Sequence, residues 1–127
     1  MFAERLSSLI DNSPQEADAL RRMADYLADM EARKPHRLNS LKLSPRRIYE
    51  ISQAGSTWRL ARVIEMLIKA GVFERRIVVR CPEGSGLQFR SYAELPDIVR
   101  DPDRDVDMEV TEDNIESQYV LVNDGCV

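Results

Sequence analysis

The sequence predicts an α+β fold that is mainly helical and carries one small β-hairpin. Two helix-start signals, at Ser44-Pro45 and at Ser56-Thr57, lie close together in the middle of the chain. Alternating apolar residues in 74–81 and 87–92 then flank a glycine-rich turn, as expected for a hairpin. We expect an N-terminal helical arm at 1–34, a domain at 38–96 and an acidic C-terminal tail at 97–127.

The N-terminal arm is expected to form two helices. Apolar residues at helical spacing predict a short helix over residues 2–10. Ser13 and Glu16 have the spacing of a capping box, which places the start of a second helix there, and this helix continues to about Arg33. Its apolar stripe needs a partner, which is either the rest of the chain or a second copy in a homodimer.

The central segment is expected to hold two helices joined by a tight turn. Ser44 caps the first helix, which we expect to end at Ala54-Gly55. Ser56 or Thr57 starts the second helix, which runs over residues 57–70 with its core face at Leu60, Val63, Ile64 and Leu67. Gly71 ends it, and the hairpin follows. Beyond Pro96 we expect a partly ordered segment with short β-like pieces around residues 106–110 and 119–122.

Charge is strongly segregated along the 127 residues, whose formal net charge is −4. Residues 1–33 carry four arginines against seven acids, residues 34–90 carry twelve lysines and arginines against four acids, and residues 91–127 carry two arginines against eleven acids. The segment charges are therefore −3, +8 and −9. A basic middle beside an acidic tail indicates a polyanionic or acidic partner.

The run Ser56-Thr57, Leu60, Val63, Leu67 and Ala70-Gly71-Val72-Phe73, followed by a hairpin, resembles the recognition helix and wing of winged helix-turn-helix proteins. This resemblance covers about half of the chain. It implies that the 57–70 helix is presented to a partner and that the hairpin tip flanks it.

Binding to DNA follows as the first functional hypothesis. In this arrangement Thr57, Arg59 and Arg62 would face base edges, whereas the other basic residues would contact phosphates. Trp58 would lie against a sugar or pack at the helix start. The predicted DNA-binding residues are Lys42, Arg46, Arg47, Thr57, Trp58, Arg59, Arg62, Lys69, Arg76, Arg80 and Arg90. The protein would act as a regulator or as a subunit of a DNA-acting bacterial complex.

The alternative hypothesis is a protein-interaction module. An adaptor subunit of a multi-component assembly, such as a defence system, could use the same helices and the acidic tail without contacting DNA. The tail could also fold back over the basic face and compete with DNA for it. Fold alone does not decide between these hypotheses.

Metal and enzyme chemistry are not expected. Residues 101–112 place acids at positions 1, 3, 5, 9 and 12, as in an EF-hand calcium loop, but position 6 is Val106 where that loop needs glycine. The single histidine, His36, lies in a linker, and Cys81 and Cys126 have no metal-like spacing and are expected to be free thiols. We therefore predict no enzyme activity, no cofactor and no metal, and a cytoplasmic protein without a membrane partner.

Overall fold

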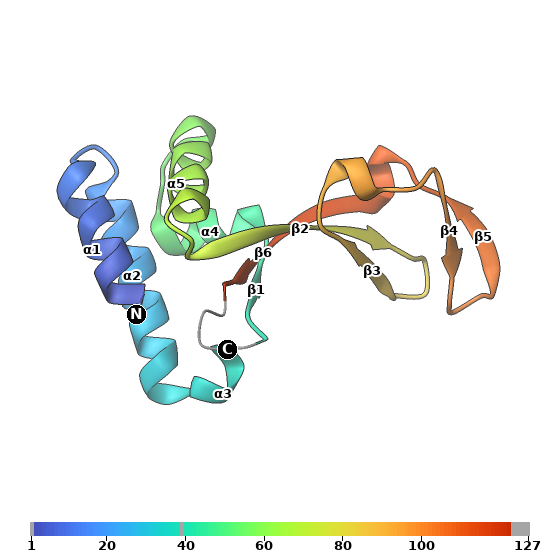
Figure 1. Cartoon of the computed structure of the whole chain (residues 1–127), viewed down its shortest axis with the longest axis horizontal. Coiled ribbons are helices and arrows are strands. Elements are labelled where there is room, and N and C mark those ends of the chain that lie inside the picture. Colours follow the sequence, from blue (N-terminus) through green and yellow to red (C-terminus); the bar gives the residue numbers. More distant parts are fainter. Residues whose placement is uncertain (1, 39, 123–127) are drawn as a thin grey trace. The chain divides into compact units, whose positions relative to one another are not determined.

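The computed structural model describes residues 2–38 and 40–122. Figure 1 shows the elements in chain order. The helices are α1 (Phe2–Asn12), α2 (Ala17–Arg33), α3 (Pro35–Leu38), α4 (Pro45–Ser52) and α5 (Thr57–Lys69). The strands are β1 (Lys42–Leu43), β2 (Phe73–Arg80), β3 (Gly86–Phe89), β4 (Ile98–Asp101), β5 (Val106–Glu109) and β6 (Ile115–Leu121). Two short 3₁₀ turns cover Tyr92–Glu94 and Glu112–Asn114.

The predicted fold class, mainly helical with one small hairpin and an acidic tail, is wrong. The described residues form a four-stranded sheet in the order β1-β6-β2-β3 and a separate two-stranded sheet of β4 and β5. The expected tail supplies β4, β5 and the long strand β6, because apolar residues there alternate with the acids and each strand finds an antiparallel partner. The winged helix-turn-helix description, in which the sheet is a small hairpin, therefore does not describe this fold.

The chain divides into two compact units. Unit 1 comprises the residues up to Glu74 and those from Tyr119 onward, and unit 2 comprises Arg75–Gln118. These boundaries differ from the segments expected at 1–34, 38–96 and 97–127. Strands β2 and β6 each begin in one unit and end in the other.

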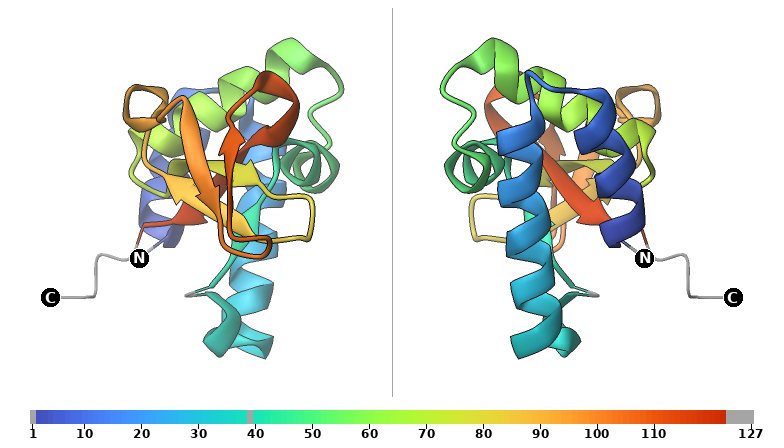
Figure 2. Two further views of the ribbon diagram at one scale, coloured as in Figure 1. Left: turned by 90° about the vertical axis from the view of Figure 1, so that its right-hand side faces the viewer. Right: turned by 90° about the vertical axis from the view of Figure 1, so that its left-hand side faces the viewer.

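Unit 1 is built around α2. The right-hand view of Figure 2 shows α1 and α2 lying side by side and antiparallel, and α2 also packs against α3 and α4. Arg5 on α1 donates to the carbonyl oxygen of Gly71 at 2.7 Å, and Arg22 on α2 donates to that of Ser52 at 3.0 Å. The apolar stripe of α2, which prompted the homodimer hypothesis, is buried within unit 1.

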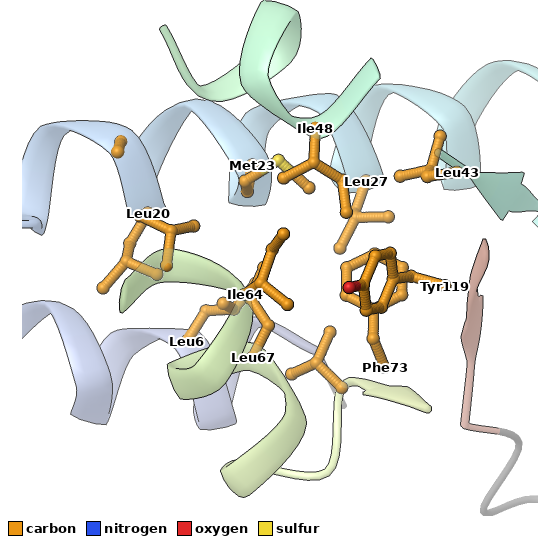
Figure 3. Close-up of a cluster of buried hydrophobic side chains, with 13 residues drawn as sticks. Leu6, Leu20, Met23, Leu27, Leu43, Ile48, Ile64, Leu67, Phe73 and Tyr119 are labelled. Atoms are coloured by element: carbon orange, nitrogen blue, oxygen red, sulfur yellow. The ribbon is translucent and has the colours of Figure 1, made fainter. Parts of the chain in front are cut away.

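The core of unit 1 combines side chains from all along the sequence. Figure 3 shows this cluster, whose labelled members are Leu6, Leu20, Met23, Leu27, Leu43, Ile48, Ile64, Leu67, Phe73 and Tyr119. Tyr119 belongs to β6, which pairs with β1 in the register Leu43 to Tyr119. The end of the chain therefore completes a core that begins in the first helix.

Two predicted helix boundaries shift. The Ser13 hydroxyl does not cap α2, which starts at Ala17 without a side-chain cap. The Glu16 carboxylate, the other half of the expected capping box, accepts from Arg62 of α5 instead. Helix α4 ends at Ser52, before the expected Ala54-Gly55. Gln53 takes the left-handed conformation at φ 52°, and Gly55 follows with φ 84°. The caps at Ser44 and Ser56 and the stop at Gly71 are confirmed.

Unit 2 contains the predicted hairpin and a second one. Strands β2 and β3 pair from Ile77 with Phe89 to Arg80 with Gly86, and Gly84 takes φ 110° in the turn between them. Strands β4 and β5 pair from Ile98 with Glu109 to Asp101 with Val106. The two turns are joined because the backbone N–H and the hydroxyl of Ser85 donate to the Asp103 carboxylate at 3.1 and 2.6 Å.

Candidate nucleic-acid interface

The first turns of α4 and α5 contain arginines and no acidic residue. Ser44 and Ser56 cap these helices by accepting from the N–H groups of Arg47 and Arg59, each at 3.1 Å. Since a helix N-terminus already carries a partial positive charge, arginines at this position strengthen it. The result is a local positive potential at both helix starts.

Basic residues of α4 remain accessible although they form ion pairs. Arg46 and Arg47 share one carboxylate, that of Glu50, at 3.4 Å each, and the Arg46 side chain is 91% exposed. The Arg47 guanidinium also lies 5.7 Å from the centroid of the Tyr26 ring. Exposed pairs of this kind are worth only about 0.3–0.5 kcal/mol, so a phosphate can replace Glu50 as the partner. Lys42 is exposed in β1, just before α4.

The start of α5 presents one arginine without a partner and one with a partner. Thr57 is exposed, and the guanidinium of Arg59 forms no hydrogen bond or ion pair within residues 2–38 and 40–122. Arg62, in contrast, donates to the Glu16 carboxylate at 3.2 Å and lies 5.7 Å from the centroid of the Trp58 ring. The Glu16 side chain is 3% exposed, which makes this pair a packing element between α5 and the start of α2.

Lys69 lies far from these residues. It sits in the last turn of α5 and forms an ion pair with Glu65 at 2.8 Å, which lowers the pKa of the Glu65 carboxyl. Twelve residues separate it from Thr57, a distance of about 18 Å along a helix. The structure therefore does not bring Lys69 together with the first turn.

The predicted basic hairpin lies in a unit that is acidic as a whole. Unit 2 holds six arginines against eleven acidic residues, a formal charge of −5. The Arg80 guanidinium forms two bonds to the Glu116 carboxylate on β6, at 2.7 and 2.6 Å. Arg76 is half-buried and donates to the carbonyl oxygen of Arg75, while Arg90 is exposed at the end of β3.

The acidic frame of residues 101–112 folds as a hairpin. Asp101 is fully buried, and its carboxylate accepts from the Arg104 side chain at 2.6 Å and from the backbone N–H of Asp103 at 2.9 Å. The Arg104 side-chain hydrogen bond, helped by the backbone N–H groups of Asp103 and Arg104, lowers the pKa of Asp101. Within the part of the chain that the structure describes, no cluster of histidine, cysteine or acidic side chains fits a metal ion.

Cys81 lies beside this buried carboxylate. It is a buried free thiol, and its pKa is raised by burial and then by the charges of Asp101 and Asp103. Such a thiol stays protonated and unreactive near neutral pH. Cys126, the other predicted free thiol, lies outside the described residues.

Unit 2 also contains a shallow pocket that the sequence did not indicate. It has a volume of about 440 Å³ and is formed by β4, β5 and the residues next to them. Its lining residues are Asp97, Ile98, Asp107, Met108, Glu109 and Val110. Asp107 is paired with Arg100, whereas Asp97 and Glu109 have no ion-pair partner within the described residues. Apolar side chains thus lie beside two unpaired carboxylates, an arrangement that suits a ligand with an apolar stem and a positive charge.

Comparison with models of protein families, with curated proteins and with solved structures gives no match. Within the described residues, no helix combines the length and the apolar character that crossing a bilayer requires.

Proposed function

We propose that this chain is a non-enzymatic DNA-binding protein whose contact surface is the first turns of α4 and α5. The observation that carries the proposal is the presence of Arg46, Arg47 and Arg59 in two first turns that lack acids. Each cation there opposes the helix dipole by about 0.3–1 kcal/mol in the free protein. A polyanion turns this unfavourable placement into a favourable one.

The roles divide by position. Lys42, Arg46 and Arg47 contact phosphates, which supplies affinity without reading sequence. Thr57 and Arg59, at the start of α5, face base edges, where a guanidinium can pair with the O6 and N7 atoms of guanine. Helix α4 is about 12 Å long, and four residues link it to α5. The separation between the two first turns is therefore shorter than one turn of duplex DNA, about 34 Å, and both can contact the same turn.

Five of the predicted contact residues are left out of this surface. Arg62 is held by the nearly buried Glu16, Lys69 lies at the far end of α5, and Arg76, Arg80 and Arg90 belong to the acidic unit 2.

The test is the salt dependence of binding to a labelled 24-base-pair duplex, measured by fluorescence anisotropy. Two phosphate contacts contribute about 1.8 to the slope of log K against log salt concentration. Arg46→Ala/Arg47→Ala should therefore flatten the slope by about 2, and Arg59→Ala should weaken binding with less effect on the slope. A matched control is Arg21→Ala/Arg33→Ala on α2, which removes two exposed arginines that also form intrahelical pairs. Equal losses in both double variants, or no binding of the folded protein to duplex or single-stranded DNA at 50 mM salt, would reject the proposal.

A second candidate function, docking of a partner protein through unit 2, is favoured by the pocket on β4 and β5. Ile98 is 60% exposed there beside Asp97 and Glu109, neither of which has an ion-pair partner within the described residues. A basic segment with an apolar residue complements this surface in charge and in polarity.

A photo-cross-linking residue placed at position 98 tests the second candidate in native cell extract. It should capture one protein through a lysine- or arginine-rich peptide, identified by mass spectrometry, and Asp97→Asn/Glu109→Gln should abolish the capture. The same probe at Gln53, an exposed residue of unit 1, is the control. Capture of the same proteins from both positions would refute docking at the pocket.

A further inference from the structure

Trp58 is the large exposed hydrophobic residue of the described part of unit 1. It is the second residue of α5, and 63% of its surface is exposed. Single exposed apolar residues are common and need no explanation by themselves. The contacts around this indole are what distinguish it.

The ring is held in place from one side. The Arg62 guanidinium lies 5.7 Å from the centroid of the indole, and the same guanidinium donates to the Glu16 carboxylate at 3.2 Å. Because Glu16 is almost completely buried, it fixes the position of Arg62, and Arg62 in turn restricts the rotamers of Trp58. An arginine over one face of a tryptophan also attracts the electron-rich ring. The Arg62 guanidinium thus lies over one face of the indole, and 63% of the Trp58 surface is exposed.

The residues beside this indole are basic. Arg59 follows it in the chain with a guanidinium that has no partner within the described residues, and the first turn of α5 contains no acid. These positive charges would not contribute to the binding of an apolar peptide. Cations next to an exposed aromatic ring are the usual combination where a nucleobase stacks and its phosphates are neutralised.

In an intact duplex both faces of each base are already stacked, so a tryptophan finds no free face except at the ends. We therefore propose that the α4–α5 surface binds DNA that contains unpaired bases, and that Trp58 stacks on one of them. This inference rests on the proposed DNA-binding function and names its substrate class. Arg46 and Arg47 hold the flanking phosphates, Arg59 faces the bases next to the stacked one, and Arg62 is a positioning residue that orients the indole.

The chain contains one tryptophan, so its emission reports on this residue alone. The full-length protein is titrated at 50 mM salt with (dT)24, with an intact 24-base-pair duplex, and with the same duplex carrying a central three-nucleotide gap. We expect (dT)24 and the gapped duplex to quench Trp58 emission and the intact duplex to leave it unchanged. Removing one base–aromatic stack weakens binding by roughly 5- to 150-fold, since stacking contributes about 1–3 kcal/mol per base.

That loss is measured with labelled (dT)24 by anisotropy. Trp58→Ala should show it, and Trp58→Phe should retain most of the affinity because a phenyl ring still stacks. Tyr92→Ala is the matched control, since it removes an exposed aromatic residue from unit 2 and should change nothing. Far-ultraviolet circular dichroism checks that each variant is folded.

The outcomes separate the two claims. If the intact duplex binds as tightly as (dT)24, emission stays constant and Trp58→Ala binds normally, stacking is refuted and DNA binding by phosphate contacts stands. If no form of DNA binds the folded protein, both claims fail and the exposed indole belongs to a protein contact instead.

Discussion

Replacing Arg62 tests whether this residue stabilises the fold or contacts base edges, the role that the sequence predicted for it. Arg62→Ala removes the ion-pair partner of Glu16, whose side chain is 3% exposed, whereas the Arg62 side chain is 45% exposed. Breaking a fully buried pair costs about 3–5 kcal/mol, and leaving a buried polar group unsatisfied costs about 1–3 kcal/mol. Since water can reach the half-exposed end of this pair, we expect a loss of about 2 kcal/mol in the free energy of unfolding.

The assay is urea unfolding followed by circular dichroism at 222 nm. A loss of about 2 kcal/mol corresponds to a melting temperature lower by roughly 6–10 °C for a chain of this size. Arg21→Ala is the control, because its 2.9 Å pair with Asp18 is exposed on both sides and should be worth less than about 0.5 kcal/mol. A double-mutant cycle with Glu16→Ala should return a coupling energy of about 1–2 kcal/mol.

An unfolding midpoint for Arg62→Ala equal to that of Arg21→Ala would refute this reasoning. Arg62 would then be free to contact DNA, and its placement outside the proposed surface would have to be withdrawn.

Three further predictions concern stability. Arg104 lowers the folded-state pKa of Asp101, so the ionised carboxylate stabilises the fold above the ordinary carboxyl pKa near 4, and this stabilisation disappears as the pH falls through the lowered value. The free energy of unfolding of Asp101→Asn should therefore fall less between pH 5 and pH 2 than that of the unmodified protein, as measured by urea unfolding. Ser44→Ala and Ser56→Ala should each cost about 1 kcal/mol, and a Ser→Gly change at either cap should cost only a few tenths. Phe73→Ala should cost about 3–5 kcal/mol because the ring is 1% exposed in the core of unit 1, and a melting temperature within 2 °C of the unmodified protein would contradict its placement there.

Local signals predicted the helices and the first hairpin well. Ser44 and Ser56 cap helices because a serine hydroxyl can accept a free N–H of the first turn, and this depends only on nearby residues. Gly71 and Gly84 mark chain reversals because they adopt positive φ angles at little cost. These features could be inferred without knowing the rest of the fold.

Pairing between distant segments could not be inferred in this way. Strand β1 has two residues, too few for any periodic pattern, and it exists because Leu43 lies opposite Tyr119. The β-like piece expected around residues 106–110 is confirmed as β5, but its partner β4 was not predicted. Several acids of this segment form ion pairs in the structure: Arg100 bonds to Asp105 and Asp107, and Arg104 to Asp101. Composition alone made this segment look like a solvated tail.

The candidate site was predicted in part for the same reason. Counting charges along the sequence located the basic middle segment, but it could not pair Arg62 with Glu16 or Arg80 with Glu116, which are separated by 46 and 36 positions. Counting charges therefore overestimated how many arginines are free to contact DNA, and it assigned the hairpin to the basic part of the protein.

The order in which residues enter unit 1 has a consequence for biosynthesis. Residues 75–118 are contiguous, so unit 2 can form as soon as that stretch leaves the ribosome. The core of the helices that are made earlier is incomplete until Tyr119, which is synthesised more than forty residues after Glu74, packs into it. A nascent chain stalled before Tyr119 would therefore expose the apolar faces of these helices, and chaperones should bind it until translation resumes.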